Sequence, residues 1–188
     1  MSRRRAQVLD GALAVLGDDG TRALTYQATD LRAGVPAGTT SNYFRSRAVL
    51  LRDVLAHLLD LDRSDWERFT QRPVETVDQL AEILADLARQ AIGPGRTRVR
   101  ARYALFLEAM THPELAGQLA TGRAEILDLG ARWLARLDLP DPGERYARLI
   151  AHLDGIVLHQ LTFPTDPFDP APGFRALLTI DTGTAGQS

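Results

Sequence analysis

Short polar side chains cluster between residues 36 and 47 in a pattern that suits contact with a nucleic acid. Thr39, Ser41 and Asn42 follow Ala37 and Gly38, so this segment is small in volume but rich in hydrogen-bonding groups. Small residues let a helix approach a phosphate backbone closely, and Thr, Ser and Asn can hydrogen-bond to phosphates or to base edges. The alternative is a plain three-helix subdomain whose exposed side happens to be small.

Side chains that could support catalysis or metal binding do not form a convincing group. The sequence contains no Gly-x-Ser-x-Gly, P-loop, dinucleotide-binding or His-Glu-x-x-His motif and no cysteine. His152 and His159 are seven residues apart on one expected helix, so their backbones lie about 10 Å apart along its axis. His57 and Asp60 could share a helix face, but two ligands make a weak site. We therefore expect no enzyme activity, no metal site and no cofactor.

The hydrophobic pattern predicts an all-α protein, because apolar residues recur at helical spacing and no alternating strand pattern or Asn-Gly hairpin occurs. Helices are expected over residues 3–16, 26–33, 36–44, 46–69, 77–91, 97–110, 114–137, 142–163 and 173–180. The buried face of the first helix is expected to consist of Val8, Leu9, Ala12, Leu13 and Leu16. That of the helix over 77–91 is expected to consist of Val77, Leu80, Leu84, Leu87 and Ala91.

Start and stop signals divide the beginning of the chain into three short helices. Thr25 is expected to cap the second helix and Gly34 to end it. Pro36 suits the first turn of the third helix, where its missing N–H costs nothing. The residues expected to seat the second and third helices on the first are Ala28, Leu31 and Val35.

Length, composition and charge favour a soluble globular protein with a basic beginning. The chain has 188 residues, of which 45% are hydrophobic and 24% charged, with a net charge of −2. Residues 1–50 carry seven Arg against four acids, whereas residues 51–188 carry fifteen Arg against twenty acids. A basic segment on an acidic body permits a polyanionic partner. Asp10 and Asp18 argue against a signal peptide, and no apolar stretch reaches the ~18 residues of a membrane span, so we expect a cytoplasmic location.

Residues 33–51, with the sequence AGVPAGTTSNYFRSRAVLL, resemble the signature of TetR-family transcriptional repressors. That signature combines Ala-Gly-Val, Gly-Thr, an aromatic-Phe pair and a following basic residue. In this chain those places are held by Gly34, Val35, Gly38, Thr39, Tyr43, Phe44 and Arg47. The chain departs from the family at Thr40, where Leu is frequent, and at Ser41, where Tyr is frequent.

The resemblance implies a three-helix helix-turn-helix DNA-binding domain over residues 1–46 and a helical effector-binding and dimerisation domain over residues 47–181. The small and polar residues 182–188 are expected to form a disordered tail. The implied function is a ligand-responsive regulator, a repressor that binds a palindromic operator in double-stranded DNA as a homodimer. An unidentified small-molecule effector would release it. The alternative is a helical homodimer that binds a small molecule or a protein partner without DNA.

The resemblance also assigns contacts with DNA. The implied set is Thr25, Gln27, Ala37, Gly38, Thr39, Ser41, Asn42, Tyr43 and Arg47. Within it, Asn42 is expected to pair with adenine and Arg47 to bind a phosphate, while Phe44 is expected in the core. Residues 3–5, all Arg, are either a flexible arm along the DNA backbone or simply solvated.

The helix over residues 142–163 is apolar on two sides and therefore needs two partners. The side expected to form the dimer interface consists of Ala151, Gly155, Leu158 and Thr162. The other reading is the central helix of a monomeric bundle.

Aromatic and Met residues on three other helices are expected to line the ligand pocket, although plain core packing would produce the same pattern. They are Trp66, Phe69, Tyr103, Phe106, Met110 and Trp133. Polar anchors for a ligand could come from His152, Asp154 and His159.

Overall fold

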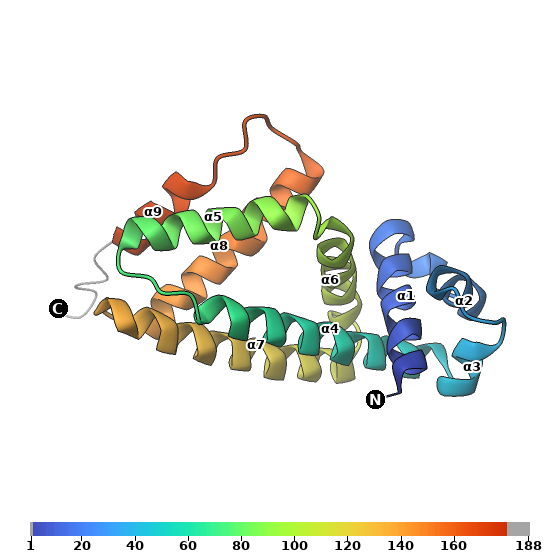
Figure 1. Ribbon diagram of the computed structural model, residues 1–188. Helices are drawn as coiled ribbons and strands as arrows, with labels where there is room; N and C mark the ends of the chain where they lie inside the picture. The colour runs from blue at the N-terminus through green and yellow to red at the C-terminus, as the bar shows by residue number, and fades with distance from the viewer. Residues whose placement is uncertain (1, 180–188) are drawn as a thin grey trace. The chain divides into compact units, whose positions relative to one another are not determined.

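Every regular element within residues 2–179, the part of the chain that the computed structural model describes, is helical (Figure 1). The α-helices are α1 (Arg3–Asp19), α2 (Tyr26–Ala33), α3 (Thr39–Tyr43), α4 (Arg47–Thr70), α5 (Val77–Ile92), α6 (Arg96–Ala109), α7 (Pro113–Leu134), α8 (Pro142–Thr162) and α9 (Ala171–Thr179). Short 3-10 turns cover Thr21–Ala23 and Ala135–Leu137. The predicted all-α class is confirmed, while the predicted tail over 182–188 lies outside the described residues.

The helices form two compact units. The first consists of residues 1–64 and 94–123, and the second of residues 65–93 and 124–188. The division does not follow the predicted boundary after residue 46, because the first part of α4 and much of α6 share an apolar core with α1. No helix in the described part of the chain is long and apolar enough to cross a membrane.

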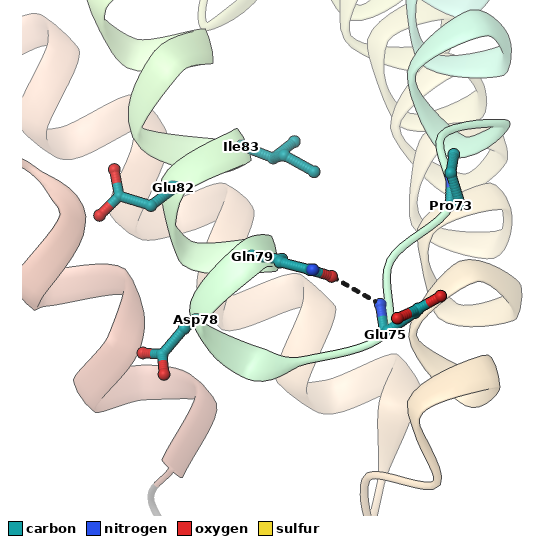
Figure 2. Close-up of a pocket in the computed structure, with 6 residues that line it drawn as sticks. All are labelled: Pro73, Glu75, Asp78, Gln79, Glu82 and Ile83. Carbon is teal, nitrogen blue, oxygen red and sulfur yellow. Dashed lines mark hydrogen bonds between the residues drawn. The ribbon is translucent and has the colours of Figure 1, made fainter.

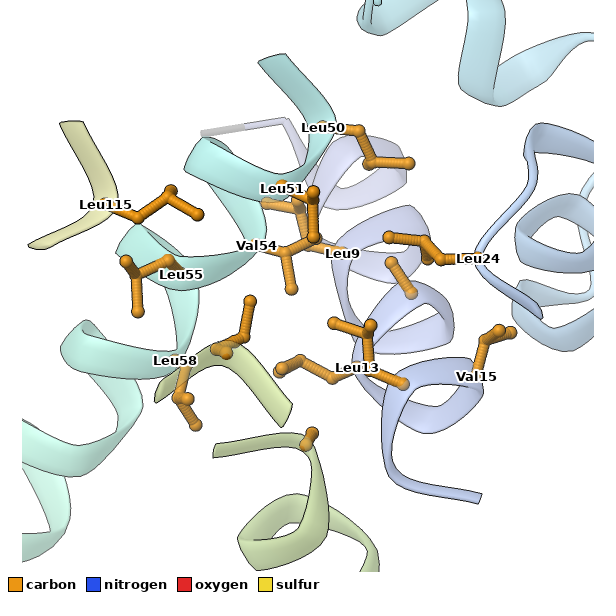
Figure 3. Packing of buried hydrophobic residues seen from close by; sticks show 14 of the residues in the cluster. Leu9, Leu13, Val15, Leu24, Leu50, Leu51, Val54, Leu55, Leu58 and Leu115 are labelled. Atoms are coloured by element: carbon orange, nitrogen blue, oxygen red, sulfur yellow. The ribbon is translucent and has the colours of Figure 1, made fainter. Parts of the chain in front are cut away.

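The apolar face of α1 lies at the centre of the first unit. All five residues predicted for this face are buried. In the close-up of Figure 3, α4 faces α1 with a second apolar row, formed by Leu50, Leu51, Val54, Leu55 and Leu58. Phe44, which follows α3, is fully buried in the same cluster, as expected from the sequence. The burial of these rows fixes α1 and α4 against each other.

The second helix has the predicted caps, but the third begins later than predicted. The Thr25 hydroxyl accepts a backbone N–H of the first turn of α2 at 3.1 Å, and Gly34 closes α2 with a φ of 62°. Because α3 begins at Thr39, the prediction that Pro36 lies in its first turn is wrong. Gly38 has a φ of 86°, a left-handed conformation that a right-handed helix cannot include, so α3 can start only after it.

The packing of α2 also differs from the prediction at Leu31, which is 84% exposed and does not seat α2 on α1. Thr29, Asp30 and Ala33 turn inward instead. Neighbouring residues of a helix point about 100° apart, so burial of Asp30 leaves Leu31 facing outward. The pattern of apolar residues misled the prediction because the inward position is occupied by a carboxylate.

The second unit packs α5 against α8 and α9. The buried face of α5 consists of Leu80, Ala81, Leu84, Ala85 and Ala88. Of the face predicted for this helix, Val77, Leu87 and Ala91 are only half-buried. Leu80 and Leu84 are buried as predicted, and Ala81, Ala85 and Ala88 complete the buried face in place of the other three predicted residues.

Gly130 of α7 allows the fully buried Tyr146 of α8 to pack against the helix backbone. A methyl group added at Gly130 would lie 2.0 Å from Cε1 and Cζ of the Tyr146 ring. Because Tyr146 is 0% exposed, its ring has no open space into which it can retreat.

Gly130→Ala should lower the free energy of unfolding by about 1–3 kcal/mol, the usual cost of overpacking a core. Gly117→Ala on the same helix is the matched control, because nothing lies within 4 Å of its added methyl group. That substitution should be neutral or stabilising by up to about 1 kcal/mol through helix propensity. Denaturant unfolding measures both, and equal stability of the two variants would contradict the packing argument.

Candidate functional site

The residues predicted to contact DNA all lie in the first unit, at the start of α2, in the turn before α3, on α3 and at the start of α4. Thr39 is half-buried and the other eight are exposed; they are Thr25, Gln27, Ala37, Gly38, Ser41, Asn42, Tyr43 and Arg47. Exposure leaves these side chains accessible to a large ligand.

Hydroxyl groups on α3 are already committed as donors. Thr39 Oγ1 donates to the carbonyl of Pro36 at 2.5 Å, and Ser41 Oγ donates to the carbonyl of Gly38 at 2.9 Å. Their oxygens can still accept hydrogen bonds. Asn42 makes no side-chain hydrogen bond within residues 2–179, so its amide offers both donors and an acceptor to a partner.

Arg47 lies beside this surface at the first position of α4. Its Nη2 donates to the carbonyl of Thr21 at 2.8 Å, which links α4 to the 3-10 turn before α2. A guanidinium has five N–H donors, so this contact orients Arg47 and leaves donors for an anion.

Asp30 of α2 is a site residue that sequence reasoning missed. It is only 4% exposed, and its carboxylate accepts hydrogen bonds from the Gly38 N–H at 2.7 Å, the Thr40 N–H at 2.8 Å and the Thr40 hydroxyl at 2.5 Å. The carboxylate therefore caps the beginning of α3 from the neighbouring helix. The only signal in the sequence is a polar residue at Thr40, where the resembled family often has Leu.

The beginning of α1 is not a flexible arm, so that reading of residues 3–5 is wrong. These arginines form the first turn of α1, and the Ser2 hydroxyl caps it. Arg5 donates to Asp53 of α4 at 2.7 Å, and its guanidinium lies 5.4 Å from the centre of the Phe44 ring. Arg5 thus holds the end of α3 to α1 and α4.

Asp18 joins three helices at the other end of α1. It accepts hydrogen bonds from the Thr97 hydroxyl of α6 at 2.7 Å and from Arg32 of α2 at 2.6 Å. These two bonds hold the pKa of Asp18 below its usual value. Arg32 also pairs with Asp19 at 2.8 Å.

The six residues predicted for a ligand pocket do not form one group. Trp66, Phe69 and Trp133 meet in the second unit. The ring centre of Phe69 lies 5.0 Å from that of Trp66 and 5.0 Å from that of Trp133. Tyr146, which the prediction did not include in the pocket, has its ring centre 5.8 Å from that of Trp66. Its buried hydroxyl finds no hydrogen-bond partner among residues 2–179. The three remaining residues belong to the first unit: Tyr103 and Phe106 lie on α6, and Met110, which is 81% exposed, directly follows that helix.

A pocket of about 520 Å³ in the second unit is lined by none of these six residues. Its lining consists of Pro73, Glu75, Asp78, Gln79, Glu82 and Ile83. Figure 2 shows Gln79 and Ile83 pointing from α5 toward the segment that carries Glu75, while Asp78 and Glu82 point to the other side of the helix. There Asp78 pairs with Arg175 at 2.5 Å. Glu75 is the carboxylate that faces this space without an ion pair in the described residues.

The histidines considered as anchors or ligands take up structural contacts. Half-buried His152 packs edge-on against Phe174 at 5.1 Å, and burial lowers its pKa. His159 is exposed beside Phe163. His57 contacts Asp10 at 2.7 Å rather than Asp60. Within residues 2–179, no group of three or more potential metal ligands occurs.

One side of α8 is apolar and exposed in the single chain. It contains the four residues predicted for a dimer interface, of which Leu158 is 49% exposed. The other three, Ala151, Gly155 and Thr162, are exposed as well. The opposite side of α8 is buried through Tyr146, Leu149 and Val157.

Comparison with known proteins identifies relatives that cover more than nine tenths of the chain. Residues 75–180 match the family described as Tetracyclin repressor-like, C-terminal domain. The chain is 27% identical over 179 residues to the HTH-type transcriptional regulator BetI of Paraburkholderia phymatum, covering 92% of this chain and 88% of BetI. The structure matches the multidrug binding protein EbrR complexed with ethidium at a TM-score of 0.68 and 26% identity, over 94% of this chain and 96% of EbrR. A TetR-family member from Streptomyces coelicolor A3 gives a TM-score of 0.67 at 26% identity, over 95% and 97% of the two chains.

Proposed function

The chain belongs to the TetR family of transcriptional regulators, and from that premise we propose that it is a cytoplasmic repressor that binds a palindromic operator as a homodimer. A small-molecule effector bound by the second unit would weaken operator binding. Members of the family are transcription factors and not enzymes, in agreement with the absence of catalytic motifs from the sequence.

The observation that carries the proposal is the exposed, uncharged and hydrogen-bonding surface of α3. A recognition helix enters the major groove and reads base edges there. The Asn42 amide can pair with adenine N6 and N7, and the Ala37 methyl group can contact a thymine methyl. Arg47, Tyr43 and the start of α2 flank α3, where phosphate contacts are expected.

Asn42→Ala and Arg47→Ala should separate base reading from phosphate binding. On a duplex that the wild type selects from a random library, Asn42→Ala should cost about 1–3 kcal/mol but little on random duplex. Arg47→Ala should weaken binding to both duplexes alike and lower the salt slope by about one. Titrations of both duplexes at several salt concentrations measure these effects.

Each outcome of these titrations has a defined reading. An equal loss on both duplexes for Asn42→Ala would make Asn42 a phosphate contact. An altered sequence preference with an unchanged salt slope for Arg47→Ala would contradict its phosphate role. If the wild type binds no duplex even at low salt, where electrostatic binding is strongest, a helical homodimer that binds a small molecule or protein without DNA replaces the proposal.

The exposed side of α8 supports a homodimer. Ala151 and Gly155 have no bulk that would prevent close approach of a second helix, and Leu158 supplies apolar surface beside them. A two-fold axis is the usual symmetry of soluble dimers. The first units of two linked chains could then engage half-sites one helical turn apart, about 34–36 Å.

Gly155→Arg should convert the dimer to monomers, because a long charged side chain would enter the contact surface. Operator affinity should fall sharply, because the first units that bind the two half-sites are no longer linked. Sedimentation gives the oligomeric state, and operator titration gives the affinity. The control is Gly117→Arg on α7, another open position, which should remain dimeric. A dimeric Gly155→Arg variant would place the interface elsewhere.

The aromatic cluster of the second unit is proposed as the effector site. The half-buried ring of Trp66 lies against the buried ring of Phe69, which in turn contacts buried Trp133, and pockets for small molecules are mostly apolar with few polar groups. EbrR, which is similar in fold, is complexed with ethidium, an aromatic molecule that such rings could stack against. Effector and operator would weaken each other by the same factor, with a coupling typically of about 1–3 kcal/mol.

Ethidium is therefore a suitable probe for the protein in the absence of DNA. Trp66→Ala should weaken ethidium binding at least about tenfold, roughly 1.4 kcal/mol, because a stacking ring is lost, and should leave operator affinity without ligand nearly unchanged. Glu75→Gln, in the pocket beside α5, is the matched control and should bind ethidium like the wild type. Fluorescence titration measures both. If Glu75→Gln weakened ethidium binding and Trp66→Ala did not, the ligand would instead bind in the pocket lined by Glu75.

A further inference from the structure

We propose that Asp30 is the positioning residue that sets the orientation of the recognition helix, so that discrimination of the operator from random DNA depends on its negative charge. The inference rests on the proposed DNA-binding function. Asp30 lies beneath α3 and acts through Gly38 and Thr40.

The recognition helix cannot hold its own position. α3 has five residues, and its N-cap is Gly38, which has no side chain to cap the free N–H groups. Isolated helices of this length are unstable, because nucleation is not compensated by enough hydrogen bonds. The missing cap comes from Asp30 of α2, which accepts the N–H groups of Gly38 and Thr40.

The contact also fixes how α3 is rotated about its axis. Thr40 is 0% exposed, and its hydroxyl and N–H both point to Asp30. Residues two apart on a helix point about 200° apart, so Asn42 faces outward because Thr40 faces inward. A rotation of α3 that follows loss of the Asp30 contact would therefore displace Asn42 from the base edge that it reads.

Three donors point to the Asp30 side chain, and only a charged carboxylate can accept hydrogen bonds from all of them. An ionised carboxylate only accepts hydrogen bonds, whereas an amide group has one acceptor oxygen and two donor hydrogens. In an Asp30→Asn variant, the amide nitrogen would face at least one of the three donors from Gly38 and Thr40. No ion-pair partner of Asp30 occurs within residues 2–179, so the backbone N–H groups and the beginning of α3 are what stabilise the charge.

The test uses the full-length protein, a duplex that the wild type selects from a random library, and random duplex of equal length. The affinity ratio of the two duplexes should fall at least about tenfold in Asp30→Asn, which is roughly 1.4 kcal/mol, with much less change on random duplex. Thr40→Val removes only the hydroxyl contact and keeps both N–H contacts, so it should lower the ratio with little loss of fold. Thr40→Ser keeps the hydroxyl group and should therefore have the same affinity ratio as the wild type.

The controls separate positioning from stability and from the proposed function. Asp19→Asn removes an exposed carboxylate that pairs with Arg32, and should leave the ratio unchanged. Thermal unfolding identifies a temperature at which every variant is folded, and binding is measured below it. Equal losses on both duplexes, or an unchanged ratio in both Asp30→Asn and Thr40→Val, would overturn the role of Asp30. A wild type that selects no duplex would instead reject DNA binding itself.

Discussion

The position of α3 in the first unit depends on the hydrogen bonds of a carboxylate buried between α2 and α3. Asp30 is 4% exposed, which would be costly for an ionised group without hydrogen bonds. Three donors from Gly38 and Thr40 compensate for that cost. At the other end of α3, Phe44 is fully buried, and its N–H donates to the carbonyl of Thr40 at 3.0 Å. Thr40 is thus held by Asp30 on one side and by the Phe44 N–H on the other. These two contacts determine which side chains of α3 face outward.

A charged side chain from a neighbouring helix also satisfies free backbone groups at the end of α9. The beginning of α6 differs, because its N-cap is Gly95 and Asp18 of α1 accepts a hydrogen bond from the side-chain hydroxyl of Thr97 rather than from a backbone N–H, so Asp18 places a negative charge beside the first turn without capping its N–H groups. Arg145 of α8 is 2% exposed and donates to the carbonyls of Leu177 and Leu178 in the last turn of α9. Acidic groups suit helix beginnings and basic groups suit helix ends, so each pairing has the favourable sign.

Local signals in the sequence were sufficient for most helices and insufficient for the site. The apolar spacing of α1 and the caps of α2 depend on residues within a few positions of each other, and those predictions are confirmed. Asp30 is eight and ten residues from its partners, and the prediction instead buried Leu31 because it is apolar. The pocket prediction failed for the same reason, because the spacing of aromatic residues within one helix does not indicate which other helices that helix contacts. It therefore combined Trp66 with Met110, which the structure places in different units.

Ion pairs with aspartates reduce the number of arginines in residues 1–50 that are available to bind a polyanion. Residues 1–50 contain seven Arg, but Arg32 is paired with two aspartates and Arg5 with Asp53. Those two guanidinium groups form ion pairs that hold helices of the first unit together, so their charges are largely neutralised there. Under the proposed function, phosphate binding would fall to arginines such as Arg47 and to neutral donors, and each neutralised phosphate would contribute about −0.9 to the salt slope. A regulator of this construction would derive relatively more of its operator affinity from the shape and hydrogen bonds of α3, which places the orientation of that helix at the centre of its specificity.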